Sequence, residues 1–228
     1  MFLGHFGLAL AAKKVAPKTS FGTALLATEF ADILWPAFLL LGWERVTIAP
    51  GITKMTPLDF VAYPWSHSLL MDLIWAAGFA AVYFVARRYR AGAWVVLASV
   101  LSHWVLDWAS HRPDMPLTPW STQKYGLGLW DSVAGTVVVE LLLFFGGLAI
   151  YLGRTKAKDR TGNIALWSFV ALLVVIWVGA VFGPPPPSLN TIKASGVAIW
   201  LTIPWAYWID RHFMLLRSKP PANINLPG

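Results

Sequence analysis

The sequence contains no cysteine, so disulfide bonds, thiolate metal ligands and cysteine nucleophiles are all excluded. Any metal site must therefore use imidazole, carboxylate and water as ligands. Charge is also scarce: Asp, Glu, Lys and Arg make up 13% of the 228 residues, whereas soluble domains carry about 25%. The sequence has no P-loop and no G-x-S-x-G motif. If the protein is a hydrolase, water is the nucleophile that the sequence supports.

Apolar surface is what the chain has in excess. Hydrophobic residues make up 57% of the sequence, and the mean hydropathy is +0.59. A single water-facing core of this size cannot hide so much apolar surface, so we expect an all-α polytopic membrane protein. The 14 tryptophans agree with this class, because indole rings favour the headgroup boundary of a bilayer.

Several apolar segments approach the roughly 20 residues that a helix needs to cross a bilayer. Residues 1–12 are too short to cross and are expected to form a short N-terminal helix or an interfacial segment. No basic residues precede the apolar stretch there, so we expect it to remain in the mature protein. The sequence predicts one membrane-embedded domain over 1–228, a bundle of about six transmembrane helices near 22–42, 68–86, 93–110, 133–152, 164–183 and 195–216.

Basic residues give the chain a net charge of +7 and lie beside the apolar segments, as in KK at 13–14, RRYR at 87–90 and RTKAKDR at 154–160. The positive-inside rule then predicts that both termini are cytoplasmic. The loops at 43–67, 111–132 and 184–194 fall on the other side. This charge is therefore interpreted as membrane anchoring in the inner (plasma) membrane, and no nucleic-acid partner is expected.

The segment LSHWVLDWASH at 101–111 places three ionisable residues at spacings of four in an apolar run. Four helical residues turn about 400° and rise about 6 Å, so His103 and Asp107 share a face. They can bind one cation together or form a simple hydrogen-bonded pair. His111 lies about 12 Å from His103 along the helix, and Pro113 ends that helix. We therefore expect His111 to be a solvated residue at the water boundary.

Other ionisable residues lie in or beside the predicted spans, where a central Asp costs about 2.5–3.5 kcal/mol. Asp32 lies inside the first span, and Pro36 four residues later cannot donate to its carbonyl, which predicts a kink with a free carbonyl. Glu29 shares the face of Asp32 and is expected to act as a buffering group. His67 begins the second span at the level of Asp107, so the two can meet.

These residues occur in an order that resembles a known family. The stretches GHFGLALAAK, ATEFADILWP, SHSLL, SHWVLDW and PDMPLTPW are similar to those of bacterial inner-membrane proteins described as metal-dependent hydrolases, over residues 1–145. The motif order is also similar to that of zinc-dependent phospholipase C and the single-strand nucleases. The chain has PWSHS where family members carry His-Arg-x-x-Thr-His-Ser, and it lacks their His-x-x-x-Glu pair. Glu140 with His111 is a weak substitute, so the resemblance implies one or two metals.

The resemblance implies that Asp32, His67, His103 and Asp107 hold a first divalent ion, and that His5 with Asp107 begins a second site. His103 and Asp107 would be the catalytic pair. Nitrogen and oxygen ligands suit Zn²⁺, with Mn²⁺ as the other choice. Such an ion activates water for hydrolysis of a phosphodiester or lipid-linked substrate. A site at the membrane face suits an amphiphilic or phosphorylated small molecule.

Two other classes of function remain open. A small ion or solute carrier could use Asp32, Glu140 and the histidines as a path beside a broken helix, although no internal repeat is evident. In a non-catalytic scaffold, the polar residues would only bond helices together. Arg112 and Lys124 either steer a phosphate or are ordinary loop charges. His212 is expected to be an interface residue.

Overall fold

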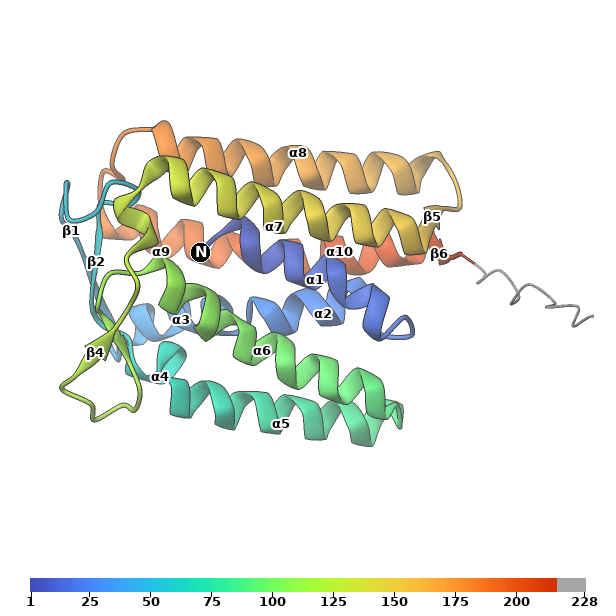
Figure 1. Cartoon of the computed structure of the whole chain (residues 1–228), viewed down its shortest axis with the longest axis horizontal. Helices are drawn as coiled ribbons and strands as arrows, with labels where there is room; N and C mark the ends of the chain where they lie inside the picture. The colour runs from blue at the N-terminus through green and yellow to red at the C-terminus, as the bar shows by residue number, and fades with distance from the viewer. Residues whose placement is uncertain (217–228) are drawn as a thin grey trace, which may run out of the picture.

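The computed structural model describes residues 1–216, of which 68% are helical, and the helices run along one axis (Figure 1). Their lipid-facing character is clear from exposed apolar residues such as Val82, Leu142 and Val175, which are 68–70% exposed. The predicted all-α membrane fold is confirmed. Among the described residues, four helices are long and apolar enough to cross a membrane: α5 (Leu69–Arg87), α6 (Arg90–Ser110), α7 (Val133–Arg154) and α8 (Arg160–Phe182).

The first predicted span is a bent pair of helices. α2 (Phe21–Thr28) and α3 (Phe30–Leu41) meet at an angle of 54° around Glu29. α3 runs through Pro36, so the break lies at Glu29 and not at the proline. The Thr28 hydroxyl donates to the Leu25 carbonyl, a bond that competes with the helical ladder and favours a bend. Counting this pair as one span gives up to five spans.

The last predicted span, 195–216, is also broken. α9 (Leu189–Ile199) and α10 (Thr202–Arg211) are separate helices, and each is too short to cross a bilayer alone. Pro204, in the first turn of α10, has no N–H to donate to the Trp200 carbonyl, which explains the interruption. The expected count of about six spans is therefore four or five in the described part of the chain.

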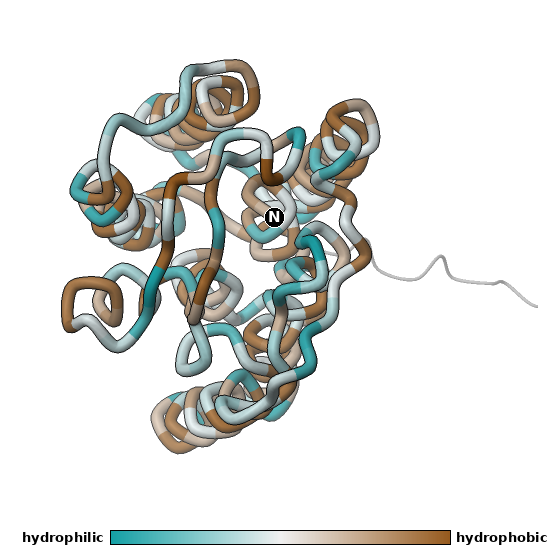
Figure 2. Tube along the Cα trace, turned by 90° about the vertical axis from the view of Figure 1, so that its left-hand side faces the viewer, coloured by the Kyte–Doolittle hydropathy of each residue, from teal (hydrophilic) through white to brown (hydrophobic). Residues whose placement is uncertain are grey.

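The N-terminal segment forms a short helix, α1 (Leu3–Val15), as predicted, but it lies inside the bundle. Leu3, Phe6 and Leu10 are at most 1% exposed, and the view from the loop end shows the chain start surrounded by the other helices (Figure 2). Glycines permit this packing. A Cβ on Gly7 would lie 2.3 Å from the Leu143 carbonyl oxygen, so α1 and α7 pack with almost no space between their backbones.

Short elements close the two ends of the bundle (Figure 1). β5 and β6 join the α7–α8 turn to the end of α10, and the other strands lie in the loops at the opposite end. The pairs are antiparallel: β1 (Arg45–Ile48) with β2 (Leu58–Ala62), β3 (Met115–Pro116) with β4 (Lys124–Tyr125), and β5 (Thr155–Ala157) with β6 (Phe213–Leu215). The remaining helical turns are α4 (Pro64–His67) and the 3₁₀ turn Leu129–Asp131.

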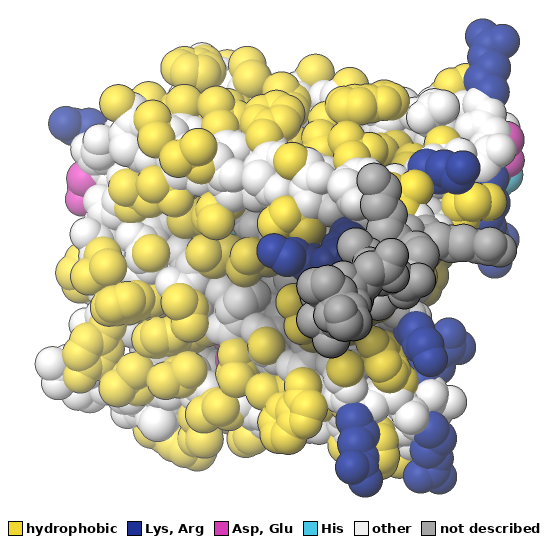
Figure 3. All heavy atoms as spheres, turned by 45° about the vertical axis from the view of Figure 1, so that its right-hand side comes forward, with side chains coloured by type: hydrophobic (Ala, Val, Ile, Leu, Met, Phe, Trp, Pro, Cys, Tyr) yellow, Lys and Arg dark blue, Asp and Glu magenta, His cyan; other side chains and the backbone are white. Residues whose placement is uncertain are grey.

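Lys and Arg side chains gather mainly at the end of the bundle that carries β5 and β6 (Figure 3). This end contains the turns after α1, α5 and α7, where the sequence clusters its basic residues. All three basic clusters therefore lie on one side, which agrees with the predicted topology. That this side is cytoplasmic stays a prediction.

Candidate metal centre

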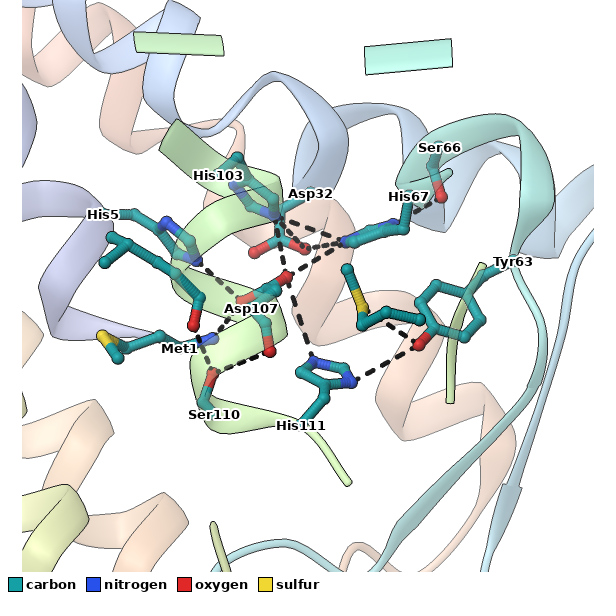
Figure 4. A network of polar contacts seen from close by, with 12 residues as sticks. Met1, His5, Asp32, Tyr63, Ser66, His67, His103, Asp107, Ser110 and His111 are labelled. Carbon is teal, nitrogen blue, oxygen red and sulfur yellow. Dashed lines mark hydrogen bonds and ion pairs between the residues drawn. The ribbon is translucent and has the colours of Figure 1, made fainter. Parts of the chain in front are cut away.

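Four of the predicted ligands converge from α3, α4 and α6 (Figure 4). His67 Nε2 lies 3.3 Å from Asp32 Oδ1 and 3.3 Å from His103 Nε2. His103 Nε2 in turn lies 3.2 Å from Asp107 Oδ2 and 3.8 Å from Asp32 Oδ1. His103 and Asp107 share one face of α6, as their spacing predicts. His67 and His103 therefore each lie within 3.8 Å of both carboxylates.

His5, the fifth predicted ligand, reaches the same group from α1. Its Nε2 lies 3.1 Å from Asp107 Oδ1, and its ring stacks on that of His103 with centroids 3.9 Å apart. The Met1 ammonium group contacts the same Asp107 oxygen. Asp107 thus lies between two sets of groups, with Oδ1 toward α1 and Oδ2 toward His103 and His67.

The distances between donors match those around a small ion. Four ligands about 2.1 Å from a tetrahedral ion lie about 3.4 Å from one another. Contacts of 3.2 to 3.8 Å link Nε2 of His67 and His103 to the carboxylate oxygens of Asp32 and Asp107. Two groups of three donor atoms, each with its atoms within 4.8 Å of one another, could each hold a metal ion, and they share His103: Asp32, His67 and His103, and His5, His103 and Asp107.

Two of the imidazole rings are held so that Nε2 faces the carboxylates. His103 Nδ1–H donates to the Thr28 carbonyl at 2.7 Å. His67 Nδ1 lies 2.6 Å from Ser66 Oγ, and because the Ser66 hydroxyl donates to Glu44 Oε2, its oxygen accepts the Nδ1 proton. Neutral rings fixed in this way present Nε2 lone pairs 3.3 Å apart. Such an arrangement requires a cation or a proton between them, and outer hydrogen bonds of this kind orient metal-ligating histidines.

Breaks in the helices create these outer hydrogen bonds. Thr28 is the last residue of α2, so its carbonyl has no partner in that helix and is free for His103. Ser68 separates α4 from α5 and accepts the Met71 N–H, which caps α5. The chain direction changes there, and His67 remains at the end of α4, facing inward.

The prediction for His111 was wrong. It is 2% exposed and is not a solvated loop residue. Its Nδ1–H donates to Asp114 Oδ1 at 2.9 Å, and its Nε2 lies 3.9 Å from Asp107 Oδ2. Burial lowers the pKa of His111. The loop after α6 folds back and bonds Gly128 N–H to the His111 carbonyl, which buries a side chain that the helix end alone would leave in water.

Glu44 was missed by the sequence analysis, although it supports His67 through Ser66. It is 2% exposed, and its Oε1 accepts the backbone N–H groups of Trp65 and Ser66, each at 2.8 Å. Burial raises the pKa of the Glu44 carboxyl. No motif marks Glu44, because it lies 22 residues before Ser66 and only the fold brings the two together.

Tyr63 and Asp114 were also missed, and they support His111. The Tyr63 hydroxyl donates to Asp114 Oδ1 at 2.7 Å, the same oxygen that accepts the His111 proton. Burial raises the pKa of Tyr63 well above its ordinary value. Arg112 is paired with Asp59 Oδ1 at 2.5 Å and with Asp114 Oδ2 at 3.3 Å. Its charge is thus already engaged, which favours the ordinary loop-charge interpretation.

Two further carboxylates are buried close to the bends and the span starts. Glu29, at the break between α2 and α3, and Asp72, in the first turn of α5, are 0% exposed. None of their carboxylate oxygens has a hydrogen-bond partner among residues 1–216. Buried carboxylates require compensation by protons or by neighbouring cations. Each of these two carboxyl groups must therefore be protonated or lie close to a cation.

Glu140 does not pair with His111 in place of a His-x-x-x-Glu motif. Its Oε2 accepts the N–H groups of Phe2 and Leu3, at 3.1 and 2.6 Å, and so holds the first turn of α1. Glu140 therefore positions the helix that carries His5.

His212 lies away from this centre. Its Nδ1 contacts Asp159 Oδ2 at 2.9 Å.

The sequence model of the YdjM inner membrane proteins matches residues 3–183. The chain belongs to the YdjM inner membrane protein family. The YdjM match is longer than the predicted resemblance over 1–145: it includes α1 to α8 and all five predicted ligands, and it ends before α9. No curated protein matches the chain, and no solved structure matches it. Membership and fold together make it a multi-pass inner-membrane protein in contact with the bilayer.

Proposed function

We propose that the protein is a membrane-bound, metal-dependent hydrolase that acts on a phosphodiester or on a lipid-linked substrate. The observation that carries this proposal is the convergence of His67 and His103 Nε2 with carboxylate oxygens of Asp32 and Asp107, at 3.2 to 3.8 Å. Each ring has its Nδ1 occupied by an outer partner, so Nε2 is left for the ion. His5 with Asp107 is the start of a second position.

The charges of the site suit a divalent ion. Asp32 and Asp107 supply two negative charges, the Met1 ammonium group pairs with Oδ1 of Asp107, and the oriented histidines supply neutral nitrogen. Zn²⁺ is the first choice for this donor set and Mn²⁺ the second. When bound with an open coordination position, such an ion lowers the pKa of water and stabilises charge on a phosphoryl oxygen.

Substrate would approach the site on the side of Asp32. Its side chain is 26% exposed, whereas those of His67, His103 and Asp107 are 0–4% exposed. In the proposed reaction the water oxygen adds to phosphorus and the ester P–O bond breaks. One water proton goes to the leaving alkoxide, and the other remains on the new phosphomonoester. Asp107, between both donor groups, would hold the first proton in transit. His103, whose Nδ1–H is bonded to the Thr28 carbonyl, would use Nε2 to help hold the ion.

An ion or solute carrier is the second candidate, because one observation favours it. The bent pair α2–α3 places Glu29 at a helix break, and its carboxylate has no hydrogen-bond partner within residues 1–216. Broken helices with acidic groups line ion paths in transporters. Asp32 follows Glu29 by one turn and belongs to the proposed centre. The two functions therefore share residues and must be separated by experiment.

Hydrolysis and flux assays on one preparation separate these functions. Purified protein, loaded with Zn²⁺ or Mn²⁺, would be assayed with a chromogenic phosphodiester and with a short-chain phospholipid. The same protein in proteoliposomes would be tested for Zn²⁺, Mn²⁺ and proton flux. A hydrolase gives metal-dependent turnover that is lost in Asp107→Asn, without flux. Flux without turnover would establish the carrier. Protein that binds no metal and shows neither activity would leave the scaffold as the remaining function.

A further inference from the structure

A cavity of about 890 Å³ lies between α3, α8, α9 and α10, and the loops at 50–58 and 183–186 border it. Its size falls within the roughly 300–1,000 Å³ of ordinary ligand pockets. Large apolar side chains from each helix form its wall, including Trp35, Leu173, Ile176, Ile192, Ile199 and Trp205. None of the five predicted metal ligands lines it. The cavity is therefore a separate apolar site.

The cavity opens toward the surface that faces lipid. Leu172 and Ile176 line it and are also 38% and 43% exposed, on the membrane-crossing helix α8. Leu201, between α9 and α10, lines it and is 69% exposed. Such residues on a transmembrane helix contact bilayer chains. An alkyl chain can therefore enter from the side without crossing water.

Lys54 is the sole charged residue among those of the described chain that line the cavity. It lies in the loop between β1 and β2, outside the membrane-crossing helices, and its side chain is exposed. Thr53 holds this loop, since its Oγ1 accepts the N–H groups of Met55 and Thr56. A lysine at the mouth of an apolar cavity near the membrane surface attracts an anionic headgroup.

Trp35 supplies an unused hydrogen-bond donor in the same wall. It is 9% exposed, and its Nε1–H has no acceptor among residues 1–216. A buried indole N–H normally finds a partner. An ester or phosphate oxygen of a bound lipid would satisfy it. These features together fit a molecule with an alkyl chain and an anionic headgroup: the wall is apolar, the cavity opens toward lipid, Lys54 is positively charged and Trp35 has an N–H donor that is free within residues 1–216.

We propose that this cavity binds the alkyl chain of an anionic membrane lipid and that Lys54 pairs with its headgroup. The cavity adjoins the metal centre through α3, where Trp35 follows Asp32 by three residues. Lipid binding does not depend on a metal, and the experiment below needs no catalytic activity. It therefore succeeds or fails independently of the proposed hydrolase.

The test uses the full chain purified in detergent, mixed with dioleoyl phosphatidylglycerol or dioleoyl phosphatidylcholine, and measured by native mass spectrometry. A tryptophan at Gly179 would fill the cavity, since a Cβ there meets no heavy atom within 4 Å and Gly179 lines the cavity. Gly146→Trp on α7 is the matched control, because its Cβ is equally unobstructed and lies outside the cavity. Elution volume and melting temperature check that each variant folds.

We expect one retained phosphatidylglycerol in the wild type and in Gly146→Trp, and none in Gly179→Trp. Lys54→Gln should reduce the preference for phosphatidylglycerol over phosphatidylcholine about fivefold, and Lys124→Gln should leave it unchanged. A lipid with a diazirine in its alkyl chain should label α8 and α9. Equal labelling of α5 and α7, or equal lipid retention by Gly179→Trp and wild type, would overturn the proposal.

Discussion

His67 and His103 bring their Nε2 atoms to within 3.3 Å, although they lie 36 residues apart and on different helices. Each ring is fixed by its Nδ1, one on the Thr28 carbonyl and the other on Ser66. Two neutral imidazoles with lone pairs this close repel unless something positive lies between them. The carboxylates of Asp32 and Asp107 complete the group, so the arrangement has the charge and spacing of a cation site.

Metal content should depend on the α6 ligands. We expect wild-type protein dialysed against Zn²⁺ to retain stoichiometric metal, and His103→Ala and Asp107→Asn to lose it, because each belongs to a group of converging donors. Elemental analysis by mass spectrometry measures this. His212→Ala is the control, since His212 pairs with Asp159 away from the centre. Equal metal in all four proteins would exclude the assigned ligands.

Glu44 should affect the metal affinity of the site although it does not bind the ion itself. Glu44→Gln weakens the hydrogen bonds that hold Ser66 and, through it, His67. Changing such an outer partner lowers metal affinity about 10- to 100-fold. Competition of bound Zn²⁺ with a fluorescent chelator gives the dissociation constant. Asp159→Asn should have no effect, and a Glu44→Gln protein with wild-type affinity would show that Ser66 alone orients the ring.

Gly7 should be essential for the packing of α1. Gly7→Ala places a Cβ 2.3 Å from the Leu143 carbonyl oxygen, which forces the two helices apart, and such overpacking costs about 1–3 kcal/mol. Gly146→Ala meets no atom within 4 Å and should stabilise α7 by about 0.5–1 kcal/mol. Unfolding in detergent, followed by circular dichroism, compares the two. A neutral Gly7→Ala would contradict the close contact.

The predicted topology can be tested with introduced cysteines, because the native chain has none. Lys156→Cys, in the basic turn between α7 and α8, should react with a membrane-impermeant maleimide only after cells are broken. Gln123→Cys, in an exposed position of the opposite loop, should react in intact cells. The reverse pattern of labelling would invert the orientation and place the candidate metal centre nearer the cytoplasm.

Composition and local periodicity were sufficient for the membrane class and for the main helices. The spans expected at 68–86 and 133–152 correspond to α5 at 69–87 and α7 at 133–154, because hydropathy over about 20 residues is a local property. The shared face of His103 and Asp107 is equally local, since helix geometry relates residues four apart. The identities of the residues that converge came from the family resemblance and not from periodicity.

Only the three-dimensional packing decides the rest. His111 is buried because the loop after α6 returns over it, and Glu44 reaches Ser66 because β1 and β2 bring the α3 end to α4. α1 lies in the centre of the bundle because Gly7 has no side chain and lets the backbone of α7 pack against α1. These contacts join residues far apart in sequence, and their free energy depends on the whole arrangement. A pattern read along one segment carries no information about them.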